Sequence, residues 1–220
     1  MVTNLQTDKL SPAAIIDEIV DQTSLSCKYE ELNHIEGHGS KDHKFCALHI
    51  NIHSVHAKLD QLKDMIATLS EKKIIVHFIL LCETFLNDTN ASLGKIDGYN
   101  LVCKNRSRGH RGGITIYVLK NLSFAVRDDI SVHVDREFES LFIEVKGAKS
   151  SILVGEVYRV PNTNAKASVE RFLNIANKLK DTKSDVNLAT DQNFDLLRYN
   201  TDKYTKELLD GLISTGFIPS

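Results

Sequence analysis

The chain has 220 residues, of which 42% are hydrophobic and 25% charged, so it is long and apolar enough to bury a core. Three prolines and eleven glycines argue against a fibrous or disordered chain. A formal net charge of -2 excludes the global positive field of a strongly basic nucleic-acid binder, although a nuclease needs positive charge only beside its cleft.

Cysteine usage and hydropathy indicate the compartment. No two of the four cysteines form a CxxC pair, and Cys82 lies inside an apolar run, which favours reduced thiols and an intracellular protein, nuclear or cytoplasmic. The first twenty residues lack a secretory signal, and no apolar stretch approaches the ~20 residues that span a membrane. We therefore expect a protein that is neither secreted nor membrane-inserted.

The first 44 residues differ in character from the rest. Residues 11–22 fit one short helix with Ser11 as N-cap and Pro12 at its first position, whereas residues 27–44 are polar and show no clear period. We expect residues 1–44 to form an extension or linker that precedes a domain over residues 45–220.

From Phe45 onward, short apolar runs alternate with amphipathic segments, and a basic glycine turn lies at 106–113. Three consecutive apolar runs in the middle of the chain have no helix pattern between them, so a sheet sandwich flanked by helices fits better than a doubly wound parallel sheet. In chain order, the pattern predicts a strand at 45–52, a helix at 57–71, strands at 74–83, 99–104, 114–120, 139–147 and 150–160, a helix at 168–182, a strand at 185–193 and a helix at 203–216 ending at Gly216.

Polar residues occur where several of these strands end, which is where layered α/β folds usually place their sites. Glu83 follows a mainly apolar run, and a buried carboxylate there needs a partner such as Mg²⁺, which prefers oxygen ligands. An exposed glutamate that caps the next helix is an equally good interpretation of the pattern. Asp191 and Asn193 would share one side of a strand and could orient a water and a phosphate, or could form a turn into the following helix.

Six segments resemble, in order, the endonuclease/exonuclease/phosphatase superfamily across residues 45–220. The turn RGG-x-x-IYV and the YR-x-P after a strand resemble the apurinic-type endonuclease domain of non-LTR (LINE-like) retrotransposons, which accompanies a reverse transcriptase. The resemblance implies a four-layered α/β sandwich, incomplete at its C-terminus, and Mg²⁺- or Mn²⁺-dependent hydrolysis of a DNA phosphodiester. The segments are LHINIHSV (48–55), LLCETFL (80–86), IDGYNLVCKNRSRGHRGGITIYV (96–118), ESLFIEV (139–145), VGEVYRVPN (154–162) and ATDQNFDLL (189–197).

The resemblance also implies a role for each matching residue. Glu83 would bind the metal, and Asn51 would be a metal-site neighbour that contacts the phosphate or metal-bound water. Tyr158 would interact with the scissile phosphate region, although an ordinary half-buried strand aromatic explains the pattern as well. Asp191 would position or activate the attacking water, and Asn193 would contact the phosphate. Contacts to the phosphate backbone are plausible for a further group, which a solvated hairpin turn explains slightly better: Arg106, Arg108, His110 and Arg111.

The sequence departs from the family pattern in two places. Thr190-Asp191-Gln192-Asn193 stands where the family usually has Gly-Asp-Phe-Asn, and the family's second aspartate and terminal Ser-Asp-His have no counterpart before the sequence ends at GFIPS. None of the nine histidines follows Asp191. Because a missing His–Asp pair removes proton management worth roughly 10²–10⁴-fold, we expect weak or no nuclease activity from the 220 residues.

Three other functions remain open from the sequence. A non-catalytic retroelement remnant would bind nucleic acid without cutting it or have no activity, and a sugar or lipid phosphatase would use the same fold. A zinc site is a weaker possibility, because paired cysteines at close spacing are missing. Its ligands would come from Cys27, His34, His38, His43 and Cys46.

Overall fold

The structure is a computed structural model that describes residues 45–104, 111–146 and 151–217. These residues form two compact units. The sheet unit contains the described residues of Gly39–Asn164 together with Thr182–Asn193, and the helix unit contains Ala165–Asp181 and the described residues of Phe194–Ser220. The predicted extension over 1–44, with its short helix, lies outside the described residues. No helix in the described ranges is long and apolar enough to cross a membrane.

The first sheet of the sheet unit has the order β1-β2-β4-β3. β1 and β2 are parallel and are joined through helix α2, while β4 is antiparallel to both β2 and β3. All five residues of β2 are buried, which explains its uninterrupted FILLC sequence: the strand has a neighbour on each side and is covered on both faces. The bounds are β1 Ala47–Asn51, α2 Val55–Glu71, β2 Phe78–Cys82, η2 Ala91–Gly94, β3 Tyr99–Lys104 and β4 Ile114–Leu119.

The second sheet has the order β5-β7-β8-β9, and β6 pairs with β7. β7 and β8 form the antiparallel hairpin that the sequence predicts, with Phe142 opposite Gly155. β8 and β9 are parallel, as expected for two strands separated in the chain by a helix. The bounds are β5 Phe124–Val126, β6 His133–Val134, β7 Phe138–Lys146, β8 Ser151–Arg159 and β9 Asp185–Asp191.

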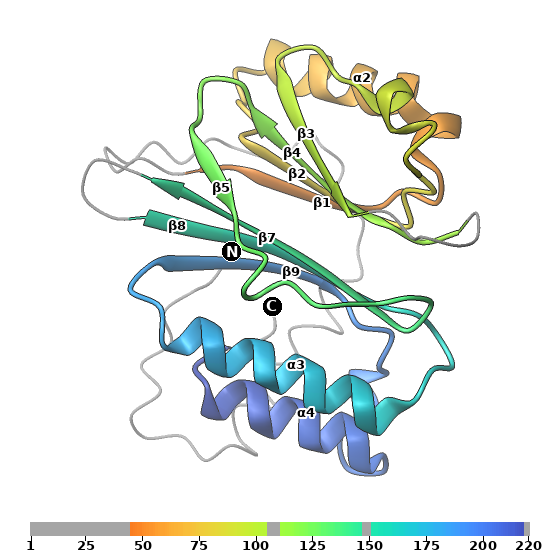
Figure 1. Ribbon diagram of the computed structural model, residues 1–220, viewed down its shortest axis with the longest axis vertical. Coiled ribbons are helices and arrows are strands. Elements are labelled where there is room, and N and C mark those ends of the chain that lie inside the picture. Colours follow the sequence, from red (N-terminus) through yellow and green to blue (C-terminus); the bar gives the residue numbers. More distant parts are fainter. Residues whose placement is uncertain (1–44, 105–110, 147–150, 218–220) are drawn as a thin grey trace. The chain divides into compact units, whose positions relative to one another are not determined.

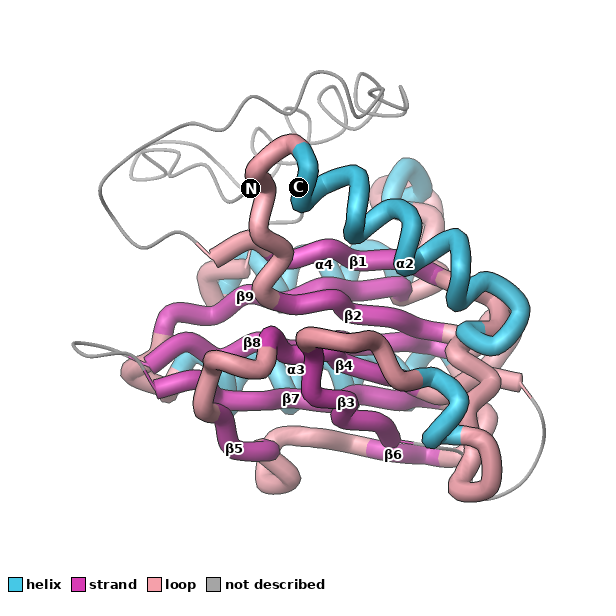
Figure 2. The backbone as a smooth tube through the Cα atoms, turned by 90° about the horizontal axis from the view of Figure 1, so that it is seen from above, coloured by secondary structure: helices cyan, strands magenta, loops and turns pink. Residues whose placement is uncertain are grey.

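The two sheets pack face to face, and α2 covers the outer face of the first sheet (Figure 1). Apolar side chains from both sheets, such as Leu80 and Ile116 from one and Leu141 and Val154 from the other, form the core between them. Figure 2 shows α2 lying across β1 and β2, and it shows the edge strands β1 and β9 on the same side of their sheets. The α/β sandwich expected from the sequence is therefore confirmed.

The helix unit pairs α3 (Ala165–Lys180) with α4 (Lys203–Ser214), which follows the short helix η3 (Leu196–Arg198). Asp202 caps α4 by accepting a hydrogen bond from the Thr205 amide at 2.8 Å. A Cβ atom on Gly211 would lie 2.4 Å from the Leu173 side chain, so the glycine allows the two helices to approach closely. α4 ends just before Gly216, which has a left-handed φ of 87°, as predicted for a helix C-terminus.

Differences from the sequence prediction occur in four strands, β2, β5, β6 and β9. β2 begins at Phe78 rather than at residue 74, and Ile75 is 61% exposed, because the apolar residues before Phe78 form the connection from α2. The short strands β5 and β6 were not predicted, since three and two residues carry too little periodicity. β9 ends at Asp191, so strand alternation does not extend to Asn193.

Candidate active site

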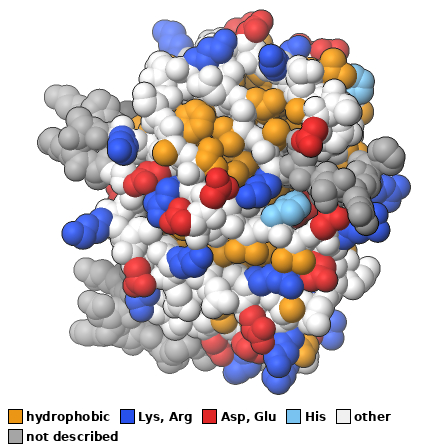
Figure 3. All heavy atoms as spheres, in the orientation of Figure 1, with side chains coloured by type: hydrophobic (Ala, Val, Ile, Leu, Met, Phe, Trp, Pro, Cys, Tyr) orange, Lys and Arg blue, Asp and Glu red, His pale blue; other side chains and the backbone are white. Residues whose placement is uncertain are grey.

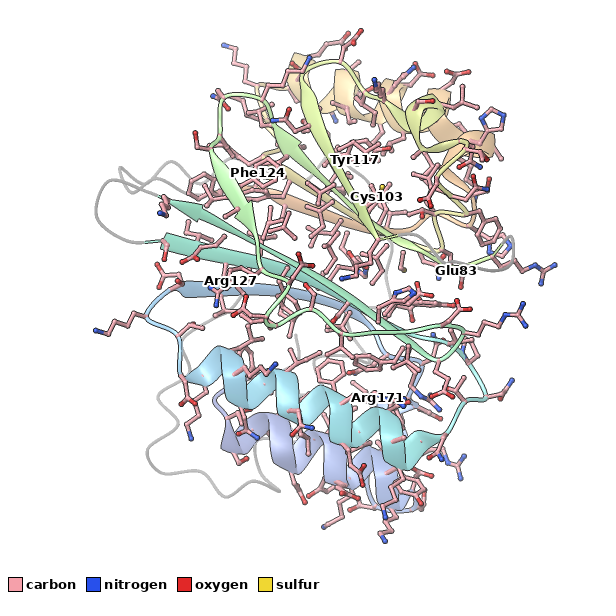
Figure 4. All side chains as sticks on the ribbon, in the orientation of Figure 1. Glu83, Cys103, Tyr117, Phe124, Arg127 and Arg171 are labelled. Atoms are coloured by element: carbon pink, nitrogen blue, oxygen red, sulfur yellow. The ribbon has the colours of Figure 1, made fainter. Side chains whose placement is uncertain are left out.

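Four of the five predicted site residues come from strands whose carboxyl ends meet in the sheet unit. Asn51 ends β1 and Glu83 directly follows β2, and these strands are parallel neighbours. Tyr158 and Asp191 are paired in the parallel register of β8 and β9. Glu83 lies just past the end of the first sheet (Figure 4). The parallel pair in each sheet therefore brings two site residues to the same edge.

One hydrogen-bond network joins these four side chains. Asn51 donates its Nδ2 to Glu83 Oε1 at 3.1 Å and to Asp191 Oδ2 at 2.8 Å. The Tyr158 hydroxyl donates to Glu83 Oε1 at 2.9 Å, and His53 Nδ1 lies 2.7 Å from Glu83 Oε2. Glu83 does not cap the next helical element, η2, whose N-cap is Asn90. Tyr158 is buried, and its hydroxyl joins it to the polar network, which an ordinary strand aromatic would not require.

The backbone that carries Glu83 adopts an uncommon conformation. Glu83 and Phe85 have φ values of 52° and 56°, and His53 and Ser54, in the loop after β1, have values of 49° and 92°. Hydrogen bonds tie the two loops together, from the Ser54 amide to the Glu83 carbonyl at 2.8 Å and from the Val55 amide to the Thr84 carbonyl at 2.9 Å. Left-handed non-glycine residues cost about 1–3 kcal/mol each and cluster at functional sites, so these loops are candidates for such a site.

The basic glycine turn supports the same loop. The Phe85 amide donates to the Gly112 carbonyl at 2.8 Å, and the Thr84 amide donates to the Gly113 carbonyl at 3.3 Å. Gly113 has a φ of 90°, and a Cβ atom there would lie 2.8 Å from Thr84 Oγ1. Its amide donates to the buried carboxylate of Glu139 at 2.8 Å. Only glycine fits this close approach, which fixes the position of the chain after Glu83.

Asn193 is held differently from the other four residues. Its Nδ2 donates to the Arg159 carbonyl at 2.7 Å, and Arg159 Nη1 donates to the Asn193 carbonyl at 2.8 Å. Asn193 also has a left-handed φ of 49°. This reciprocal pair ties the residue after Tyr158 to the loop after Asp191, so the structure places Asn193 beside the network but gives its amide a backbone partner.

The surroundings of Glu83 favour its ionised form. Partial burial raises the pKa of its carboxyl, but the hydrogen bonds from Asn51, His53 and Tyr158 outweigh this and leave the pKa below the ordinary value. The side chain is 17% exposed. At neutral pH the site therefore presents a carboxylate whose two oxygens already accept three hydrogen bonds.

The donor set fits a hard divalent cation. The Glu83 and Asp191 carboxylates accept from the same amide nitrogen, so two acidic groups lie close together, and a cation between them would relieve their repulsion. Carboxylate oxygens are the ligands that Mg²⁺ and Mn²⁺ prefer. Asn51 directs its Nδ2 toward the two carboxylates, and this arrangement suits a residue that orients the metal ligands. A direct contact between Asn51 and the metal stays a prediction.

Sequence reasoning missed several polar residues at the site. His53 binds Glu83, and His49 Nε2 lies 2.9 Å from Glu156 Oε1. Strand alternation carries a signal for two of them, because His49 and Glu156 lie two positions before Asn51 and Tyr158 and therefore share a strand face with them. An ionisable residue on the inward face of an apolar strand is therefore the sequence signal that indicates these two site residues.

The predicted nucleic-acid contacts and the zinc alternative fall mostly outside the described residues. Arg106, Arg108 and His110 lie there, while Arg111 is described and exposed. Of the zinc candidates, the structure describes only Cys46, whose backbone amide donates to His77 Nδ1 at 3.1 Å. The three described cysteines are not in disulfides: Cys46, Cys82 and Cys103.

Comparison with solved structures finds the same fold in a retrotransposon endonuclease domain and in other proteins. The endonuclease domain of TRAS1, a telomere-specific non-LTR retrotransposon, matches with a TM-score of 0.57 at 13% identity, over 79% of this chain and 71% of that domain. TDP2 from C. elegans matches with a TM-score of 0.55 at 10% identity, over 88% of this chain and 70% of the other. An endonuclease/exonuclease/phosphatase family protein from Bacteroides thetaiotaomicron matches with a TM-score of 0.51 at 15% identity, over 76% and 66%.

No family model matches the sequence, and no curated protein matches it at a significant level. At 10–15% identity the structural matches establish the fold. The chain has the α/β sandwich fold of the endonuclease/exonuclease/phosphatase superfamily, as the sequence motifs predict. A retrotransposon endonuclease domain has the same fold.

Proposed function

We propose that the chain is a divalent-metal-dependent phosphodiesterase that cleaves the DNA backbone, with Mg²⁺ or Mn²⁺ as the metal. The observation that carries the proposal is the single network of Asn51, Glu83, Tyr158 and Asp191 at the carboxyl ends of four strands. The fold, which nucleases share, supports the same class of chemistry without deciding the substrate.

Each residue would have a defined role in this reaction. Glu83 and Asp191 would hold the metal, which would supply positive charge to the phosphate oxygens. Asn51 would keep the two carboxylates in place through its Nδ2, and Asp191 would accept a hydrogen bond from the attacking water and align it. Tyr158 would hold the Glu83 carboxylate and face the phosphate, and Asn193 would contact a phosphate oxygen after giving up its bond to Arg159.

We expect the activity of the 220 residues to be low. In the described part of the chain, the imidazoles that bind site carboxylates are His49 and His53, and each is already engaged by a glutamate. A general acid must be able to give its proton to the leaving oxygen, and such a group contributes typically 10²–10⁴-fold. We also propose that this chain is a retroelement protein that works beside a reverse transcriptase, in the nucleus or cytoplasm.

Contacts with DNA would have to come from a few basic side chains near the site rather than from the overall charge of the chain. Basic and acidic side chains are interspersed over the face drawn in Figure 3, in keeping with the net charge of -2. The exposed Arg111 directly precedes Gly112 and Gly113 in the glycine turn that supports the Glu83 loop, and this turn is our candidate for contact with the phosphate backbone. Such contacts weaken with salt because they release counterions.

Nicking of supercoiled plasmid with Mg²⁺ or Mn²⁺ tests the proposal. We expect slow, metal-dependent nicking that falls by at least about 100-fold in Glu83→Gln. The matched control is Glu71→Gln, at the exposed end of α2, which should nick like the unmutated chain. If folded protein does not nick, or if Glu83→Gln nicks normally, the phosphodiesterase proposal is wrong.

Two further readouts separate the other functions. Salt-dependent DNA binding without cleavage would identify a non-catalytic nucleic-acid-binding protein. Hydrolysis of a simple phosphomonoester without plasmid nicking would identify a phosphatase that uses the same carboxylates.

A further inference from the structure

A second group of metal-binding side chains lies between the sheets. His49 on β1, Cys82 on β2 and Glu156 on β8 each offer one donor atom, and these three atoms lie within 4.8 Å of one another. The closest pair is His49 Nε2 and Glu156 Oε1, at 2.9 Å. The proposed hydrolytic reaction uses none of these three residues.

Hydrogen bonds offset the burial of the Glu156 carboxylate only in part. The side chain is completely buried, and its Oε2 has no hydrogen-bond partner among the described residues. A buried carboxylate with an unsatisfied oxygen is costly unless a positive charge lies beside it. His49 supplies only one hydrogen bond, to the other oxygen. A bound cation would satisfy the free oxygen and neutralise the charge.

The donor atoms of the three residues lie close enough together to approach one ion. Donor atoms around tetrahedral zinc lie about 3.3–3.7 Å apart, given metal–ligand bonds of about 2.0–2.3 Å. The distance of 2.9 Å between His49 Nε2 and Glu156 Oε1 is slightly shorter than that range, and all three donor atoms lie within 4.8 Å of one another. The His49 side chain is 34% exposed, which gives an ion a path from solvent.

We propose that His49 Nε2, Cys82 Sγ and the Glu156 carboxylate form a binding site for Zn²⁺ or a similar borderline-soft transition metal, with water as the fourth ligand. A thiolate and an imidazole select such an ion over Mg²⁺, whereas the oxygens of Glu83 suit Mg²⁺. Binding releases the thiol proton to solvent, so the site holds the metal as a thiolate complex. The site goes beyond the proposed hydrolytic function and does not depend on it.

Cobalt titration of the full, reduced and metal-free chain tests this site. Co²⁺ should bind in one equivalent, give a thiolate-to-cobalt charge-transfer band in the near ultraviolet, and be displaced by Zn²⁺. Cys82→Ser should remove the band. Cys103→Ser, which changes a cysteine of β3, should retain it (Figure 4 labels Cys103). Glu156→Gln should weaken cobalt binding by at least about tenfold.

Two controls keep the result unambiguous. Cys27→Ser and Cys46→Ser test whether thiols nearer the N-terminus supply the band instead. If Cys82→Ser does not fold, Glu156→Gln and His49→Gln with wild-type circular dichroism take its place. X-ray absorption of the zinc-loaded wild-type chain should show one sulfur and three nitrogen or oxygen ligands. The absence of a charge-transfer band at saturating cobalt, its loss in Cys27→Ser or Cys46→Ser, or two or more sulfur ligands would overturn the proposal.

Discussion

Replacing Asn51 by aspartate exchanges the side-chain amide at the centre of the network for a carboxylate of nearly the same size and shape. Asn51 Nδ2 now donates to both Glu83 and Asp191, at 3.1 and 2.8 Å. In Asn51→Asp both donors disappear, and a third carboxylate takes their place. We therefore expect the folded state to lose stability at neutral pH and to gain affinity for a divalent cation.

The size of the effect follows from these two contacts. A hydrogen bond to a charged group contributes about 1.5–3 kcal/mol when buried. Asn51 is exposed, so solvent screening reduces each contribution to about 1 kcal/mol. Repulsion between like charges about 4 Å apart adds roughly 1 kcal/mol in a water-like dielectric. Together these terms predict a loss of about 2–4 kcal/mol in the free energy of unfolding.

Urea unfolding at pH 7, with and without Mg²⁺, measures both effects. Without Mg²⁺, Asn51→Asp should unfold at a lower urea concentration than the unmutated chain, with an unchanged slope. Mg²⁺ at ten times its dissociation constant should restore about 1.4 kcal/mol. Asn121→Asp, at an exposed turn of the same unit, is the matched control and should show neither change.

Two results would refute this reasoning. A destabilisation below about 0.5 kcal/mol would mean that the amide does not bridge the carboxylates in solution, because lost surface contacts have that size. A destabilised Asn51→Asp that Mg²⁺ does not rescue would mean that the three carboxylates do not converge on one cation, and it would remove the basis for the metal site.

Three other substitutions test the supports of the site. Tyr158→Phe should cost about 1–2 kcal/mol at pH 7. The depressed pKa of Glu83 stabilises the fold above its ordinary value of 4.5, and this contribution is lost as the pH falls through the depressed value. The cost measured by urea unfolding should therefore shrink in acid, and a pH-independent cost would contradict the assignment. Gly155→Ala places a Cβ atom 2.1 Å from the Phe142 ring and should lower stability by about 2–3 kcal/mol; wild-type thermal unfolding would disprove this overpacking. Gly113→Ala should cost about 1–3 kcal/mol and slow nicking, and nicking at the unmutated rate would show that the turn does not position Glu83.

Much of the fold could be predicted because its main elements carry strong local patterns. The apolar FILLC run, the alternating hairpin over 138–159 and the three amphipathic helices each identify an element. β5 and β6 could not be found, because their short pairings with β7 depend on tertiary context. The start of β2 was misplaced because apolar residues continue into its connection, where Ile75 faces solvent.

The candidate site was predicted by residue but not by geometry. Polar groups at strand ends indicate Asn51, Glu83 and Asp191, and the parallel pairings that bring them together depend on sheet order, which local periodicity does not contain. Asn193 shows the limit of periodicity, since β9 ends before it and its φ of 49° turns the chain away from strand geometry. His53, which sits in a left-handed loop, carried no pattern at all.

The separation of the site residues along the chain has a consequence for biosynthesis. Asn51 and Asp191 lie 140 positions apart. At about 5–20 residues per second, a ribosome needs about 7–28 s between them. During that interval Asn51 and Glu83 exist without Asp191, and the nascent chain has no complete pair of carboxylates for a cation. At the proposed Glu83–Asp191 site, cation binding would therefore begin only after β9 has joined β8, so a metal-sensitive signal from the nascent chain would report the closing step of folding.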